Sequence, residues 1–225
     1  GRGADHGQKL RGGMAAAALI GVFFSLRLGL GIEAEKQTSF RWWVINRLTF
    51  LVAANNLAGF MVFFLQERFP VYQGAEVAGP ASRIIMFVGI FILVSALPGG
   101  WLADKFGKKL LSAIAGILVG IGAAIVIFAP TITGVIFIGA SIVGIGIGLF
   151  YSANWALGTE LVPQDRAGQF LGLSNLAGAG AGAIGAYIGG PIADNLSYVL
   201  LMVIYGSMAV ISTLALLGIK EPKSA

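Results

Sequence analysis

Five stretches of this chain carry no charged side chain, and their lengths restrict its possible folds more than any other feature. They run over 48–66, 84–103, 110–159, 167–193 and 195–219 and contain 19, 20, 50, 27 and 25 residues. A helix needs about 20 apolar residues to cross the hydrocarbon core of a bilayer, so four of the stretches fit one crossing each. The 50-residue stretch fits two, because Pro130 and Gly134 break it near its middle. The sequence predicts an all-α membrane protein, a bundle of six transmembrane helices.

These stretches also divide the chain into segments. We expect helices near 42–66, 84–103, 110–129, 134–156, 168–189 and 197–219. Residues 40–220 then form the transmembrane bundle, residues 221–225 a cytoplasmic C-terminal tail, and residues 1–39 a cytoplasmic linker or tail. The linker contains an apolar run over 14–26 that is short for a crossing, so it is expected to be an interfacial helix, with a further crossing as the alternative. Because residue 1 is a glycine, we also expect the chain to be a fragment of a longer protein.

Arginine and lysine are distributed unequally between the two sides of the predicted bundle. With the N-terminus in the cytoplasm, 13 of the 15 basic residues fall on the cytoplasmic side, and Arg68 and Arg83 fall on the other. The positive-inside rule predicts this asymmetry. We therefore expect a multi-pass protein of the cell (inner) membrane with both termini cytoplasmic. The net charge of +5 is explained by this orientation, so the lipid bilayer is the expected partner and nucleic acid is not.

Several classes of chemistry lack the residues that they need. The chain contains no cysteine, and its one histidine, His6, lies in a polar N-terminal segment. No hydrolase or metalloprotease motif occurs, and no carboxylate lies deep within a predicted crossing. The sequence therefore predicts no enzyme, no metal site and no cofactor.

Two predicted cytoplasmic loops resemble those of a known family. Residues 100–109 read GWLADKFGKK, which resembles the signature loop of the major facilitator superfamily, G-x-L-A-D-[RK]-x-G-[RK]-[RK]. Residues 158–168 read GTELVPQDRAG and resemble the second cytoplasmic loop of a family half. Complete members have two six-helix halves, so the resemblance implies one half of a major-facilitator fold, the carboxy-terminal one. An amino-terminal six-helix half would then be a missing partner.

A second resemblance concerns the solute. Residues 40–50 are similar to the seventh helix of sucrose/proton symporters and glycoside cation symporters. The two resemblances together imply secondary active transport of a small polar solute, a sugar or glycoside, by alternating access, with a proton or sodium ion as co-substrate. A non-transporting membrane subunit or a channel-like bundle is the alternative function.

The 100–109 loop is also expected to act as a cytoplasmic gate. Its glycines allow a tight reversal between two helices, and its carboxylate and lysines can pair with charges of the next cytoplasmic loop. The functional interpretation is a latch that forms in one transport state and breaks in the other; the alternative is that the lysines only set orientation. The gate residues are Gly100, Asp104, Lys105, Gly107, Lys108, Lys109, Glu160 and Arg166.

Polar side chains within the crossings suggest a solute site. The first predicted helix carries several and the third only Ser112, so the first should face protein or a cavity and the third can face lipid. On the fourth helix, Gly144 and Gly148 lie on one face with aromatic residues and permit close approach of a neighbouring helix. The proposed solute contacts are Arg47, Asn55, Tyr151, Asn154 and Trp155.

Two of these residues have alternative interpretations. Arg47 can extend to the cytoplasmic surface instead of binding a substrate anion or acting as a coupling group with a partner in the missing half. Trp155 can belong to an interfacial aromatic belt. The fifth predicted helix carries glycine pairs at 168/172, 178/182 and 185/189, a spacing that favours tight helix packing.

Overall fold

A computed structural model of the protein describes residues 38–162, 165 and 167–220. Within this part of the chain every regular element is a helix, which agrees with the predicted all-α membrane bundle. The predicted interfacial helix, the C-terminal tail and Arg166 lie outside the described residues. The elements are α2 (Thr38–Gly59), α3 (Met61–Arg68), η1 (Gly74–Val77), α4 (Ala78–Phe106), α5 (Lys108–Phe128), α6 (Gly134–Leu161), α7 (Ala167–Asn195), α8 (Tyr198–Ser212) and η3 (Thr213–Gly218).

The first predicted helix is broken rather than continuous. α2 ends at Gly59 and α3 begins at Met61, and the two helices meet at 55°. Glycine weakens a helix at this point, and Phe60, between them, has backbone angles of φ −96° and ψ 4°. The sequence prediction of a single helix near 42–66 was wrong here, because the structure divides this segment into two helices.

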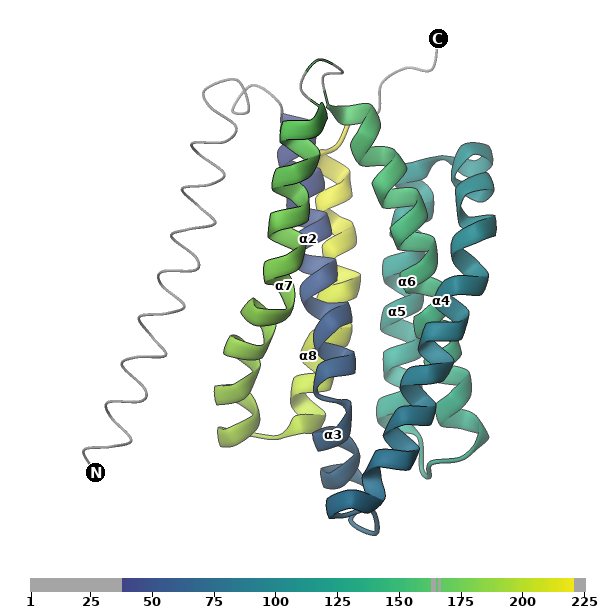
Figure 1. The fold of residues 1–225 in the computed structure, drawn as a ribbon, viewed down its shortest axis with the longest axis vertical. Helices are drawn as coiled ribbons and strands as arrows, with labels where there is room; N and C mark the ends of the chain where they lie inside the picture. The colour runs from purple at the N-terminus through teal and green to yellow at the C-terminus, as the bar shows by residue number, and fades with distance from the viewer. Residues whose placement is uncertain (1–37, 163–164, 166, 221–225) are drawn as a thin grey trace, which may run out of the picture.

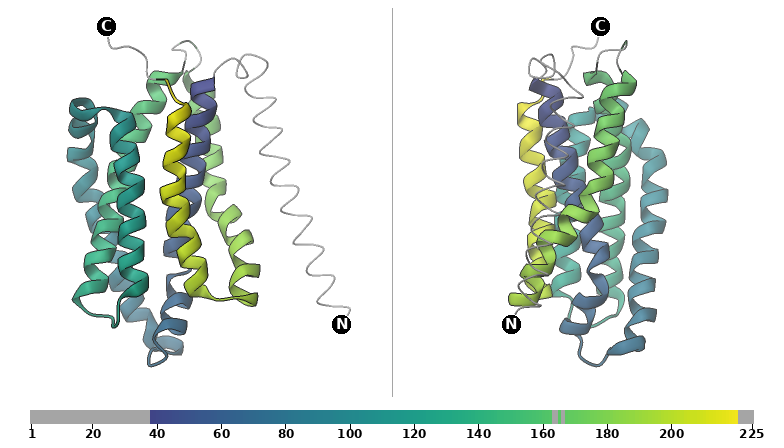
Figure 2. Two further views of the ribbon diagram at one scale, coloured as in Figure 1. Left: turned by 180° about the vertical axis from the view of Figure 1, so that it is seen from behind. Right: turned by 60° about the vertical axis from the view of Figure 1, so that its left-hand side comes forward.

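The helices form two groups of three that lie side by side. α4, α5 and α6 pack together in one group, and α2, α7 and α8 in the other (Figure 1). The groups contact one another through α5 with α8 and through α2 with α6. All long helices follow the long axis of the molecule, and the views in Figure 2 show the same arrangement from behind and from the side.

One end of the bundle collects most of the described basic residues. The start of α2, the α4–α5 junction, the end of α6 and the end of η3 all lie at this end (Figure 1). These segments carry Arg41, Lys105, Lys108, Lys109 and Lys220. Arg68 and Arg83 lie near the α3–α4 connection at the opposite end. The fold therefore separates the basic residues as the predicted topology requires.

The chain is a multi-pass membrane protein by the length and apolarity of its helices. Four described helical segments are long and apolar enough to cross a bilayer, namely Gly74–Phe106, α5, α6 and Tyr198–Gly218. The bent pair of α2 and α3 makes a fifth. α7 has 29 residues, or about 43 Å at 1.5 Å per residue, which is long enough to cross. The crossing by α7 stays a prediction.

Glycines on α6 allow neighbouring helices to approach on two sides. A Cβ atom at Gly144 would lie 2.8 Å from Phe91 Cβ of α4 and would also collide with the backbone oxygen of Val88. At Gly146 a Cβ atom would lie 2.8 Å from the backbone oxygen of Ala115 on α5. The predicted close approach at Gly144 and Gly148 is confirmed, with α4 as the neighbour.

The glycines of α7 are only partly used for packing. A Cβ atom at Gly185 would collide with the side chain of Asn56, and one at Gly189 with Tyr205 and Phe60. Gly168 and Gly172 face open space, so the packing predicted for that pair was wrong.

The outer faces of α4 and α5 are apolar and exposed. On α5 the exposed residues Leu110, Ile114, Ile117 and Ile121 follow one helical face, as expected for a helix that can face lipid. α4 is more exposed still, because its 29 residues include only five buried ones, Ala81, Ile84, Ser95, Gly99 and Ala103.

Candidate functional site

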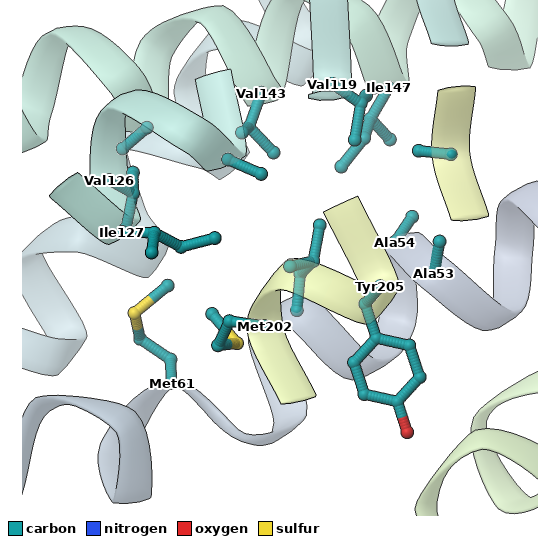
Figure 3. Close-up of a cluster of buried hydrophobic side chains, with 14 of the residues drawn as sticks. Ala53, Ala54, Met61, Val119, Val126, Ile127, Val143, Ile147, Met202 and Tyr205 are labelled. Atoms are coloured by element: carbon teal, nitrogen blue, oxygen red, sulfur yellow. The ribbon is translucent and has the colours of Figure 1, made fainter. Parts of the chain in front are cut away.

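A cavity of about 270 Å³ lies between the two groups of helices. Its volume is close to the lower limit of the ~300–1,000 Å³ that small-molecule sites usually have. α2, α4 and α6 supply most of its wall, and the other contributors are Met61 of α3, Ala123 and Val126 of α5, and Met202 of α8. Figure 3 shows part of this apolar wall, with Met61, Val126, Val143, Ile147 and Met202.

Two of the described residues that line the cavity have polar side chains, Asn55 and Tyr151. Asn55 is exposed and Tyr151 is 40% exposed, so both offer polar groups to the cavity. Their helices are held together by the rings of Phe50 and Phe150, which stack with centroids 3.5 Å apart and planes within 8°. The sequence predicted that Asn55 and Tyr151 would face one cavity, and the structure brings them to the same one.

A buried polar cluster connects α2 and α6 nearer the basic end. Arg47 is 8% exposed, and its Nη1 donates a hydrogen bond to Asn154 Oδ1 at 3.3 Å. Asn154 Nδ2 donates to Asn46 Oδ1 at 2.7 Å, and Asn46 Nδ2 donates to the backbone oxygen of Ser212 at 2.8 Å. Each member therefore fixes the orientation of the next.

Two tryptophans enclose the Arg47 guanidinium. Its central carbon lies 5.7 Å from the ring centroid of Trp43 and 5.1 Å from that of Trp155, within the range of cation–π attraction. Trp43 is fixed in turn, because its Nε1 donates to the backbone oxygen of Asn154 at 2.8 Å. The indole rings thus replace water around part of the charge.

This cluster corrects three expectations from the sequence. Arg47 does not extend to the surface, because Asn154 and the tryptophans hold it inside. Asn154 does not face the cavity, because it is fully buried and both its side-chain atoms are used within the cluster. Trp155 lies beside Arg47 and is not one of the residues that line the cavity, and its place in an interfacial belt stays a prediction.

Trp43, Asn46 and Ser212 were missed as members of this cluster. Trp43 and Asn46 belong to a stretch whose aromatic and polar content is visible in the sequence. Ser212 contributes only its backbone oxygen, so the residue type at this position does not indicate that it belongs to the cluster.

The predicted gate residues are only partly brought together. Lys108 Nζ lies 2.6 Å from Glu160 Oε1 and 3.4 Å from Asp104 Oδ1, so one ammonium joins the two carboxylates. Lys105 Nζ lies over the rings of Trp101 and Phe106, 4.8 and 5.4 Å from their centroids.

Lys109 takes a different direction from Lys108. Its Nζ donates to the backbone oxygen of Ile219 at 2.8 Å, which links the start of α5 to the end of η3. Of the expected network, the described ion pairs join Asp104, Lys108 and Glu160.

The two loop glycines have different roles. Gly107 has φ +96°, a conformation that favours glycine, and it joins α4 directly to α5. Gly100 lies inside α4, and a Cβ atom there would have no neighbour within 4 Å. The expectation that Gly100 serves the reversal was wrong. Gly99 is the close-packed glycine, since its Cβ atom would lie 3.2 Å from Ser152 Cβ.

The family of this chain is shown by its match to a known family of membrane proteins. A model of the Major Facilitator Superfamily matches residues 48–225. This chain belongs to the major facilitator superfamily. The family match includes the residues that line the cavity and the Asp104–Lys108–Glu160 cluster, whereas Trp43, Asn46 and Arg47 precede it.

Similar proteins of the superfamily include transporters named for inositol and glucose. The Minor myo-inositol transporter IolF of Bacillus subtilis is 27% identical over 132 residues, 58% of this chain and 30% of its own length. Inositol transporter 4 of Arabidopsis thaliana is 40% identical over 68 residues, 30% of this chain and 12% of its own length. The human Solute carrier family 2, facilitated glucose transporter member 12 is 28% identical over 107 residues, which are 48% of this chain and 17% of its own length. The chain thus matches less than a third of the length of these relatives.

Proposed function

We propose that this chain is one half of a secondary active transporter that moves a small polyhydroxylated solute, a sugar or cyclic polyol, by alternating access. The observation that carries the proposal is the cavity between α2, α4 and α6, with Asn55 and Tyr151 on its wall. Membership of the superfamily and the similarity to transporters named for inositol and glucose support it.

The chemistry of the cavity suits such a solute. An asparagine amide both donates and accepts, which matches a hydroxyl group, and tyrosine adds a hydroxyl and a ring face. The aliphatic lining suits the C–H faces of a sugar or polyol ring. Asn55 lies about 26 Å along α2 from Thr38, well inside the bundle, which is where transporters of this general kind bind their solutes.

The ion pairs at the basic end suit a gate. Lys108 is 20% exposed and holds Asp104 from α4 and Glu160 from α6. A rotation of α4 or α6 would separate these groups, so the cluster stabilises one arrangement over the other. We propose that this is the state-dependent latch and that the basic end faces the cytoplasm of an inner-membrane protein.

A second, amino-terminal six-helix half is proposed as the partner. It would supply the opposite wall of the cavity and cover the exposed face of α4. Among the described residues no carboxylate lines the cavity, so a proton- or sodium-binding acid is assigned to that half.

Uptake into proteoliposomes tests this function. The transporter that carries this chain should accumulate or exchange labelled myo-inositol or glucose, and Asn55→Leu should raise the apparent KM about tenfold, the effect of losing roughly 1.4 kcal/mol of hydrogen bonding. Tyr151→Phe should raise KM less, because the ring is kept. Tyr187→Phe is the matched control, since Tyr187 is also 40% exposed but does not line the cavity. Absence of solute-specific flux from correctly folded protein would favour a non-transporting subunit.

A further inference from the structure

The charge of Arg47 has no counter-ion among the residues that the structure describes. The side chain is more than nine-tenths buried within a membrane-spanning helix, and its one hydrogen-bond partner is the neutral amide of Asn154. A buried charge in a membrane is costly, and such residues usually face a partner or a pathway. The cluster therefore maintains an unneutralised cation at a defined position.

One edge of the guanidinium has no hydrogen-bond partner among the described residues. Nη1 is bonded to Asn154, whereas Nε is buried without a partner and no described residue accepts from Nη2. Nε and Nη2 form the side edge of the guanidinium, whose two parallel N–H groups match the two oxygens of a carboxylate or phosphate. Trp43 and Trp155 pack beside the guanidinium, so the unpaired edge is the remaining direction for hydrogen bonds.

The surrounding cluster holds this edge in place. Asn154 is bonded to Asn46, and Asn46 to the backbone of α8, so the amide that binds Nη1 cannot turn away without breaking a second bond. Arg47 is also close enough to Tyr151 for an electrostatic interaction, and Tyr151 lines the cavity. Arg47 itself is not one of the residues that line the cavity, so the unpaired edge belongs to a buried, prearranged position next to the cavity wall.

We propose that Arg47 binds the oxoanion group of an acidic sugar or polyol, a carboxylate or a phosphate monoester. The proposal rests on the proposed transport function and narrows the solute to one that carries hydroxyl groups and a negative charge. Arg47 pairs with the anion through Nε and Nη2, Trp43 and Trp155 exclude water, and Asn154 positions the guanidinium.

Binding measurements with matched solutes test the proposal. The transporter in detergent is titrated with glucuronate, glucose 6-phosphate and glucose, which share a ring and differ at one carbon, and binding is followed by tryptophan fluorescence because Trp43 and Trp155 flank the guanidinium. At least one of the two acids should bind about tenfold or more tightly than glucose, and the better of them identifies the anion as carboxylate or phosphate.

Variants then assign the preference to Arg47. Arg47→Gln should reduce the affinity ratio of acid to glucose to about one, and Arg47→Lys should keep part of it, because a lysine retains the charge but not the two-pronged edge. Arg83→Gln, which removes an exposed arginine at the opposite end, is the charge-matched control and should leave the ratio unchanged.

Each outcome is decisive. Equal affinities of the unaltered transporter for acids and glucose, binding of neither acid, or an unchanged ratio in Arg47→Gln would overturn the anion site and leave Arg47 as a link between α2 and α6. The first comparison needs no variant, so a misfolded Arg47→Gln does not obscure it. Uptake of myo-inositol without acid preference would retain the proposed function and reject this inference, whereas absence of flux for every solute would reject the function itself.

Discussion

Replacing Gly148 with leucine is expected to prevent folding of most of the protein. A Cβ atom at this position of α6 would collide with the backbone oxygen of Ile92 and with Ser95 Oγ, and would lie 3.1 Å from Ile92 Cα. Backbone atoms cannot rotate away as a side chain can, so α4 and α6 would have to separate. Overpacking of this kind costs typically 1–3 kcal/mol, and we expect about 3 kcal/mol or more for leucine.

Alanine variants of two glycines give the matched comparison. Gly148→Ala should lower the melting temperature in detergent, whereas Gly100→Ala should leave it unchanged or raise it. Gly100 lies inside α4 with open space beside it, so alanine there gains helix propensity worth about 0.5–1 kcal/mol. Size-exclusion profiles and melting curves measure both effects. Equal melting temperatures for the two alanine variants would show that the close contact of α4 and α6 is absent.

Neutralising Lys108 is expected to reduce transport about tenfold while changing stability little. The Lys108 ammonium holds Asp104 and Glu160 at once, 3.4 and 2.6 Å away, so Lys108→Gln breaks both ion pairs. Exposed ion pairs contribute about 0–1 kcal/mol to folding, so membrane insertion and melting temperature should change little. The rate depends on the balance between two transport states, and the cluster stabilises one of them.

Two further variants separate the latch from general positive charge. Lys105→Gln removes a neighbouring lysine that lies over Trp101 and Phe106, so its effect on the uptake rate should be smaller. Exchanging the charges in Lys108→Glu with Glu160→Lys should restore part of the rate lost in Lys108→Glu alone, because one ion pair can re-form. If Lys105→Gln and Lys108→Gln slow uptake equally and the exchange restores nothing, the lysines act only through orientation.

The number and place of the helices were largely predictable because they depend on local properties. A stretch without charge can enter the bilayer and a charged turn cannot, so Asp104, Lys109 and Glu160 lie within two residues of the end of α4, the start of α5 and the end of α6. The start of α4 was predicted less well, because the helix begins at Ala78, five residues before Arg83. The bend at Phe60 was not predictable in this way, because no charge or proline marks it.

The rotation of each helix about its axis was harder to predict, since it depends on contacts between distant parts of the chain. Tyr151 and Asn154 are three residues apart on α6, yet Tyr151 lines the cavity and Asn154 is fully buried against α2. Asn154 is fixed by Asn46 and Arg47, more than 100 residues earlier in the chain. The spacing of residues along α6 does not indicate these contacts. The sequence correctly predicted that Asn154 makes polar contacts inside the bundle, but it did not predict that Asn46 and Arg47 are the partners.

The central claim, that the cavity holds the solute, can be tested by protection of a single cysteine. The chain contains no cysteine, and Ala58 is an exposed residue of the cavity wall one turn from Asn55. In the transporter made cysteine-free elsewhere, Ala58→Cys should react with a small alkylating reagent. At a myo-inositol concentration about ten times its apparent Kd, roughly a tenth of the sites are free, so the rate should fall roughly tenfold. Gln73→Cys, in the exposed α3–α4 connection, should react at the same rate with and without solute. Unchanged alkylation of Ala58→Cys in a protein that still transports myo-inositol would contradict the account, because the solute would then bind elsewhere.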